Sequence, residues 1–450
     1  MTENTAFPIT AEAGVLRLAR AWLGLGIAAL VGSGLLAVLL VASRTPGLQD
    51  FFPRRDFFRA ALVVHVDLSV LIWFLAFAVL LWTLAGSARW LRLGWGAWAL
   101  AVAGTLLMSL SPFLPGAEPL LNNYVPVLDQ VWFLAALALV GVGFALAVLR
   151  ALVGAWPGQA GQRSAALTFG LYLSAWSGAL ALAAMGLSLA YGPDISGTAY
   201  YELTFWGPGH ALQFQHALLM LVAWWWLAAE MGVPPRCAPR TASWLFALAA
   251  VPVLAVPAIY ALWPVGSEGH MASFAWLMQA GHTLMLPLML LLLASLPRTW
   301  QMRQPATSAL WASALLFACG GVLGYLIRGV NVVIPAHYHG SIVGITLAFM
   351  GLAYVLLPRL GYAAVDGRMA RLQPYVYGGG QLLHILGLAW SGGYGVQRKV
   401  AGADQVLATL SEKLAMGMMG TGGLIAIIGG IMFVWVCLRA MSQRVASPPR

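Results

Sequence analysis

Two of the eight histidines in the sequence, His337 and His339, are separated by a single residue in an apolar stretch that runs to Pro358. On a helix of 3.6 residues per turn, positions i and i+2 lie roughly 200° apart. The two imidazoles therefore cannot ligate one metal ion from one helix. They can instead each bind a separate flat metal cofactor, one on either side of the helix. Because an imidazole inside a membrane is costly, it usually has a function.

The helices that must position these histidines are membrane spans. Hydrophobic residues make up 61% of the 450-residue chain and charged residues 8%, a balance that excludes a water-soluble globule. A spanning helix needs about 20 apolar residues. We therefore expect an all-α membrane protein with twelve transmembrane helices, forming one polytopic domain over residues 1–450. The predicted helices are 15–43, 58–84, 91–112, 122–148, 165–191, 204–230, 241–263, 270–296, 306–327, 333–357, 374–395 and 417–440.

Basic residues predict the orientation. With the N- and C-termini in the cytoplasm, sixteen of the 24 lysines and arginines fall in cytoplasmic segments, as the positive-inside rule requires. The net charge of +10 is thus mostly a topology signal, and no nucleic-acid partner is expected. Arg398 and Lys399 are among eight exceptions on the outer side, and one explanation is that they neutralise carboxylates of a bound cofactor. The alternative is that they are ordinary loop charges.

Two further histidines are expected at the same depth as His337 and His339. His65 lies about two turns into the second predicted helix, and His210 lies under two turns into the sixth. All three helices start outside, so the four imidazoles share a level in the outer half of the membrane. Such a level suits a pair of planar cofactors. Imidazoles on both faces of a porphyrin give a low-spin haem that passes electrons, whereas one imidazole leaves the opposite face open for a small ligand.

The pattern resembles subunit I of the haem-copper oxidase superfamily, which includes oxygen reductases and the related nitric oxide reductases. The resemblance covers nearly the whole chain. It is carried by twelve helices, His65, the motif Phe205-Trp-Gly-Pro-Gly-His210, the motif Ala336-His-Tyr-His339, and the segment His384–Gly392 followed by Arg398-Lys399.

The resemblance implies a role for each of these residues. His65 and His339 would bind the iron of the low-spin haem, and His337 would bind the iron of the high-spin haem at the catalytic position. Arg398 and Lys399 would hold the haem propionates. His210 would be the first ligand of a second metal, either copper or non-haem iron.

The sequence departs from the family pattern at the second metal. The family places a His-His pair near the outer end of the seventh helix, where this chain has Ala261-Leu262. One imidazole does not make a transition-metal site. His270 and Glu268 could supply substitute ligands if the helix end is rebuilt. Many oxygen reductases also carry a tyrosine four residues after the sixth-helix histidine, a position that Phe214 occupies here.

Two functional interpretations remain. The first is an oxidoreductase that passes electrons from a low-spin to a high-spin haem, which binds or reduces O2 or NO, with the missing tyrosine favouring NO. The second is a non-canonical haem protein of the same fold without the second metal, acting in electron transfer or gas binding. A transporter would show paired repeats and broken helices, which we do not find.

Both interpretations require partners outside the chain. The sequence contains no copper-binding soluble domain and no Cys-x-x-Cys-His haem-attachment motif. The electron donor is therefore expected to be a cytochrome- or copper-containing partner subunit or a quinol. The expected location is a bacterial-type inner (plasma) membrane, where the helices contact lipid.

Overall fold

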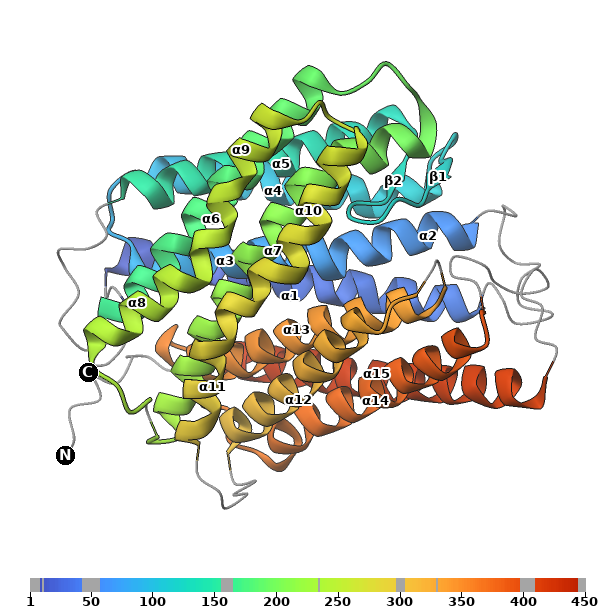
Figure 1. The fold of residues 1–450 in the computed structure, drawn as a ribbon. Helices are drawn as coiled ribbons and strands as arrows, with labels where there is room; N and C mark the ends of the chain where they lie inside the picture. The colour runs from blue at the N-terminus through green and yellow to red at the C-terminus, as the bar shows by residue number, and fades with distance from the viewer. Residues whose placement is uncertain are drawn as a thin grey trace. The chain divides into compact units, whose positions relative to one another are not determined.

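The fold was analysed in a computed structural model that describes residue 9 and residues 12–42, 57–154, 165–233, 235–296, 304–328, 331–396 and 409–443. Each of the twelve predicted spans appears as a helix or a run of helices (Figure 1). Eleven of them are long and apolar enough to cross a membrane within these described ranges. The remaining one is α14 (Arg368–Gly393). The predicted all-α membrane fold is thereby confirmed.

The chain divides into two compact units, which are described separately. The first comprises residues 1–225 and 235–295, and the second comprises residues 226–234 and 296–450. The helix α7 (Gly197–Glu230) contributes its last residues to the second unit. The single domain over residues 1–450 stays a prediction.

The first unit contains the elements from α1 to α11. Their order is α1 (Ala13–Ala42), α2 (Phe57–Val66), the π-helix η2 (Asp67–Ile72), α3 (Trp73–Ala85), α4 (Leu91–Leu110), η3 (Ser111–Phe113), β1 (Pro119–Leu120), β2 (Val127–Leu128), α5 (Val131–Val153), α6 (Ala165–Tyr191), most of α7, α8 (Pro239–Ala250), η4 (Val251–Leu254), α9 (Ala255–Leu262), α10 (Glu268–Gly281), η5 (His282–Met285) and α11 (Leu286–Ser295). The two strands pair antiparallel.

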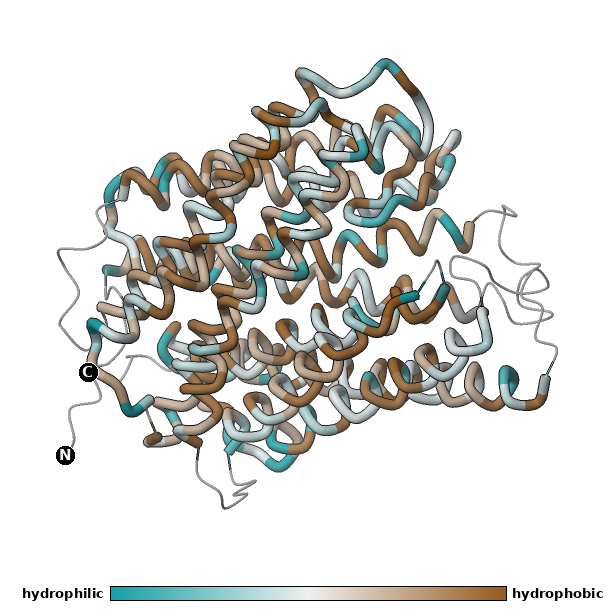
Figure 2. Tube along the Cα trace, viewed as in Figure 1, coloured by the Kyte–Doolittle hydropathy of each residue, from teal (hydrophilic) through white to brown (hydrophobic). Residues whose placement is uncertain are grey.

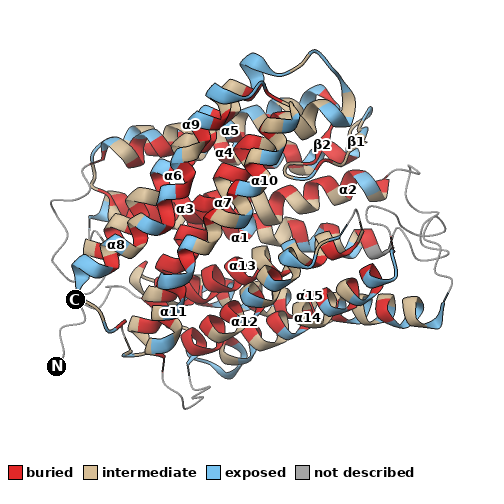
Figure 3. Ribbon diagram, viewed as in Figure 1, coloured by how far each residue is buried: buried red, intermediate tan, exposed pale blue. Residues whose placement is uncertain are grey.

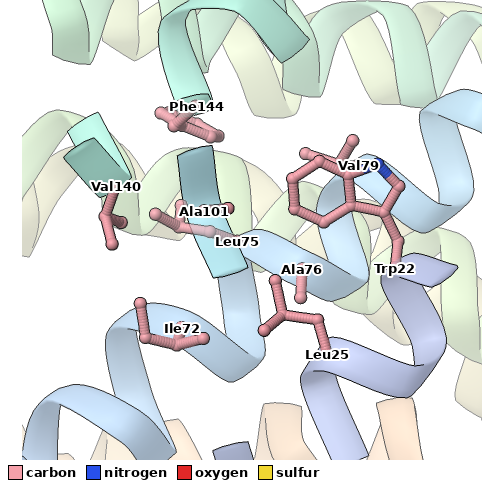
Figure 4. Close-up of a pocket in the computed structure, with 9 residues that line it drawn as sticks. All are labelled: Trp22, Leu25, Ile72, Leu75, Ala76, Val79, Ala101, Val140 and Phe144. Carbon is pink, nitrogen blue, oxygen red and sulfur yellow. The ribbon is translucent and has the colours of Figure 1, made fainter. Parts of the chain in front are cut away.

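The helix α3 lies at the centre of the first unit. Its residues from Trp73 to Leu84 are all buried (Figure 3), as expected for a helix that is apolar on every side. A small cavity beside it is lined only by apolar side chains, including Trp22 and Phe144 (Figure 4). Its volume of about 10 Å³ leaves room for one water molecule at most, and an apolar cavity stays dry. The interior here is therefore closely packed.

The second unit is built on four long helices that lie side by side (Figure 1). They are α12 (Pro305–Tyr325), α13 (Val333–Arg359), α14 and α15 (Leu410–Ser442). The apolar side chains of Leu424, Ile431 and Trp435 on α15 are exposed, and hydrophobic residues dominate the helices (Figure 2). These exposed side chains are suited to contact lipid. Glu230 forms an ion pair with Arg359 in this unit.

Four predicted helix starts were wrong by six residues or more. The last two spans begin at Arg368 and Leu410, and not at residues 374 and 417. The fourth helix begins at Val131, after the β1–β2 hairpin, and not at residue 122. Asn122 bonds its own loop through its side chain, and Pro126 lacks the N–H that a helix needs. The sixth helix begins at Gly197 and not at residue 204, which places His210 about three and a half turns from its start.

Candidate cofactor site

His65 is the second-last residue of α2 and lies two residues before the start of the π-helix η2. Its Nδ1 is 2.8 Å from the carbonyl oxygen of Ser33 and 2.9 Å from the hydroxyl of the same residue on α1. A carbonyl oxygen only accepts hydrogen bonds, so we assign the proton to Nδ1 and the lone pair to Nε2. This is the tautomer that binds a metal through Nε2.

The backbone around His65 is held in place as well. The hydroxyl of Ser69 donates to the carbonyl of His65 over 2.7 Å, and the hydroxyl of Ser33 donates to it over 3.0 Å. These bonds lie where the helix widens into a π-turn, a feature frequent at functional sites. The position of the imidazole is therefore fixed through both its ring and its main chain.

His337 is held in the same way in the second unit. Its Nδ1 is 2.7 Å from the carbonyl oxygen of Gly320 on α12. A Cβ at Gly324 would lie 2.7 Å from the same nitrogen, so a glycine is required there to admit the ring. The Nδ1–H again donates to a carbonyl, and Nε2 keeps its lone pair.

His339 faces a different helix from His337. Its ring lies 4.9 Å from the ring of His384 on α14 and 5.4 Å from that of Tyr338. His337 thus contacts α12 and His339 contacts α14, as the predicted 200° separation requires.

His210 in the first unit is engaged at both ring nitrogens. Its Nδ1 is 2.6 Å from the carbonyl oxygen of Trp206, and its Nε2 is 2.9 Å from the hydroxyl of Tyr124. Because the carbonyl fixes the proton on Nδ1, the phenol must donate its proton to Nε2. The nitrogen that a second metal would use is occupied by a tyrosine.

Tyr124 comes from the connection between β1 and β2. The side-chain oxygen of Asn122 accepts from the backbone N–H groups of Tyr124 and Val125, each over 3.0 Å. A Cβ at Gly209 would collide with the Tyr124 ring, so this glycine admits the phenol beside α7. Burial, with a smaller contribution from the charge of Glu202, raises the pKa of Tyr124. The phenol therefore remains a donor at neutral pH.

Replacing Tyr124 with phenylalanine should lower the free energy of unfolding by about 1–3 kcal/mol, because it leaves the buried Nε2 of His210 without a donor. The measurement is thermal unfolding of the purified protein in detergent. Tyr201→Phe is the matched control, since the Tyr201 hydroxyl makes only a 3.5 Å contact with Asp129. Equal losses in the two variants would contradict the assigned hydrogen bond.

His270, one of the residues proposed as a substitute metal ligand, does not complete a metal site with His210, although the ring of Phe274 packs against both imidazoles. His270 is fully buried, and its ring packs against Tyr260 and Phe274 at 5.0 and 5.1 Å. Leu262, at the expected place of the His-His pair, is exposed at the end of α9. In the part of the chain that the structure describes, no three His, Cys, Asp or Glu side chains could hold a metal ion together. These residues do not fit the second metal of the family.

The predicted haem ligands are divided between the two units of the chain, and two predicted site residues are not described. His65 and His210 belong to the first unit, and His337 and His339 belong to the second. Arg398 and Lys399 lie outside the described residues. Tyr124 was missed by the sequence analysis, although Asn-Asn-Tyr-Val-Pro is a turn-forming composition that could have marked it as a loop residue.

The model of one protein family matches residues 17–442, and its description is cytochrome c and quinol oxidase polypeptide I. The chain belongs to this family. It is a protein like subunit I of the haem-copper oxidases, as the motifs of the sequence indicated. Haem groups are general cofactors of this family, and partner subunits and electron donors are general features.

Individual relatives agree with this assignment. Uncharacterized protein RP382 of Rickettsia prowazekii (strain Madrid E) is 30% identical over 498 aligned positions, covering 94% of this chain and 96% of the relative. A protein of Aquifex aeolicus (strain VF5) is 26% identical, covering 79% and 88% of the two chains. A solved heme-copper terminal oxidase dimer has a TM-score of 0.70 at 16% identity, covering 98% of this chain and 86% of its own. The last similarity concerns the fold alone.

Proposed function

We propose that this chain passes electrons from a low-spin haem bound by His65 and His339 to a high-spin haem bound by His337. With the second haem held by His337, the protein would bind or reduce a diatomic gas, O2 or NO. When bound, a haem with two imidazole ligands supplies electron transfer, and a haem with one supplies an open face for a gas. The residues of the chain orient the imidazoles and keep each in the tautomer that binds iron.

The hydrogen bonds at Nδ1 carry this proposal. Ser33 and Gly320 each present a backbone carbonyl to a histidine that the family pattern assigns to haem. Metal-binding histidines almost always donate their second ring N–H in this way, which fixes the ring and raises its basicity. At both of these histidines the carbonyl belongs to a neighbouring helix, whereas Nδ1 of His210 and of His282 lies against a carbonyl four residues earlier in the chain.

Arg398 and Lys399 complete the proposed haem contacts. Two cations adjacent in sequence can neutralise two propionates through charge-assisted hydrogen bonds. We assign them this role from the family pattern, in which a basic pair follows the segment that corresponds to His384–Gly392.

The second candidate function is a haem protein without the second metal, acting in electron transfer or gas binding. The observation that favours it is the hydrogen bond from Tyr124 to Nε2 of His210. A metal at this nitrogen would have to displace the phenol, and it would still need two or three further ligands. In this form, His210 is a hydrogen-bonded part of the protein interior.

Electrons must reach the first haem from outside the chain. We propose a cytochrome- or copper-containing partner subunit or a quinol as the donor. The relatives in Rickettsia and Aquifex support a bacterial inner membrane as the location of this integral membrane protein.

The deciding experiment is a determination of haem, copper and non-haem iron per polypeptide in the purified protein. Two haems without another metal would support the second candidate, and two haems with one copper or non-haem iron would support the reductase. In the latter case, the bond between Tyr124 and His210 must open in the loaded protein. A protein that binds fewer than two haems when haem is supplied would contradict both.

A further inference from the structure

The Nδ1–H of His384 donates to a backbone carbonyl of a neighbouring helix, as it does in His65 and His337, two of the proposed haem ligands. Its Nδ1 on α14 is 2.9 Å from the carbonyl oxygen of Met419 on α15. The proton therefore resides on Nδ1, and Nε2 carries a lone pair. The ring lies 4.9 Å from the ring of His339, with an angle of 59° between the two planes.

The contact between α14 and α15 fixes this arrangement. A Cβ at Gly422 would collide with the backbone nitrogen of His384, and a Cβ at Gly387 would lie 2.5 Å from the backbone nitrogen of Met419. Glycines at both positions let the two backbones approach without side chains between them. The carbonyl of Met419 is thereby held against the imidazole of His384.

We propose that His384 is a positioning residue for His339. Its Nε2 accepts the hydrogen bond from Nδ1–H of His339 when Nε2 of His339 binds the low-spin haem iron. This inference rests on the proposed function.

The two other proposed haem histidines show which kind of partner Nδ1–H of His339 requires, namely a hydrogen-bond acceptor on a neighbouring helix. His65 and His337 donate Nδ1–H to backbone carbonyls of neighbouring helices, whereas the neighbour of His339 is a second imidazole. That imidazole itself donates to Met419, so the three groups form a chain of hydrogen bonds in which each strengthens the next. Such a chain raises the basicity of His339 and stabilises the oxidised iron.

The test is a spectroelectrochemical titration of the low-spin haem in the full-length, haem-loaded protein. His384→Leu should shift the ratio of reduced to oxidised low-spin haem at a fixed potential about tenfold toward the reduced form, if the affinity for the oxidised iron falls by the factor of about ten that loss of such a partner causes. The six-coordinate spectrum should persist. His384→Gln retains an acceptor oxygen and should restore most of the ratio.

His282→Leu is the matched control. His282 also has Nδ1 near a backbone carbonyl, at 3.1 Å from Met278, and its ring stacks on that of Phe214. It belongs to the first unit, and its replacement should leave the ratio unchanged. If His384→Leu does not fold, His384→Asn is the second variant, because its side chain is too short to support His339 and should give the same shift.

The outcomes separate this inference from the proposed function. If His339→Ala keeps the six-coordinate spectrum, the ligand assignment itself is wrong. If His339→Ala loses that spectrum while the His384 variants titrate like the wild type, the ligand assignment stands and the role of His384 is wrong. An equal shift in His384→Leu and His282→Leu would also overturn that role.

Discussion

Replacing His337 with alanine should remove the haem that binds carbon monoxide and leave the six-coordinate spectrum of the other haem intact. His337 is the single protein ligand proposed for the high-spin haem, which binds carbon monoxide. Its loss removes the only proposed bond from the chain to that iron. His339 is supported separately, because its ring faces α14 and the ring of His337 faces α12. Optical spectra of the reduced protein with and without carbon monoxide measure both species.

His65→Ala should give the reverse pattern, with the six-coordinate spectrum lost and carbon monoxide binding kept. His216→Ala is the control for the removal of a buried histidine, since His216 packs its ring against Phe74 and has no proposed ligand role. This control should retain both spectral species. The assignment fails if His337→Ala and His65→Ala abolish the same species.

The opposite directions of His337 and His339 could be predicted from the sequence because they depend only on helical geometry. A spacing of two residues sends the side chains to different neighbours whatever those neighbours are. The number of helices was equally accessible, because the length of an apolar segment is set by the bilayer. Both results follow from local properties of the chain.

The partner of His210 was not accessible in this way. Tyr124 is 86 residues away from His210 in sequence, and hydropathy joined its loop to the following helix. The carbonyls that hold His65 and His337 come from residues 32 and 17 positions away. Such contacts depend on how helices pack, which a single sequence does not encode in any periodic signal.

The position of His337 should therefore be sensitive to substitution of the glycines at which α12 and α13 pack closely. A Cβ at Gly320 would collide with the backbone nitrogen of Ser341 and lie 2.6 Å from the carbonyl carbon of Gly340. At the next position, Gly321, a Cβ would meet nothing within 4 Å. The two residues share a helix and differ only in the side on which they lie, so they form a matched pair.

Gly320→Ala should lower the free energy of unfolding by about 1–3 kcal/mol, because α12 and α13 must separate to admit the methyl group. The same displacement moves the carbonyl of Gly320 away from Nδ1 of His337, so the affinity for the carbon-monoxide-binding haem should fall by about tenfold. Gly321→Ala should retain the haem and gain up to about 1 kcal/mol from its better helix propensity.

Thermal unfolding and haem retention on dilution have to be measured on the same samples, because packing and ligand support are separate effects of one glycine. A variant Gly320→Ala that unfolds earlier yet keeps its haem affinity would show that the hydrogen bond to His337 does not orient the ligand. If Gly321→Ala lost haem affinity to the same extent as Gly320→Ala, the loss could not be attributed to the α12–α13 contact. Only a joint loss, confined to Gly320→Ala, fits a carbonyl placed by close helix packing.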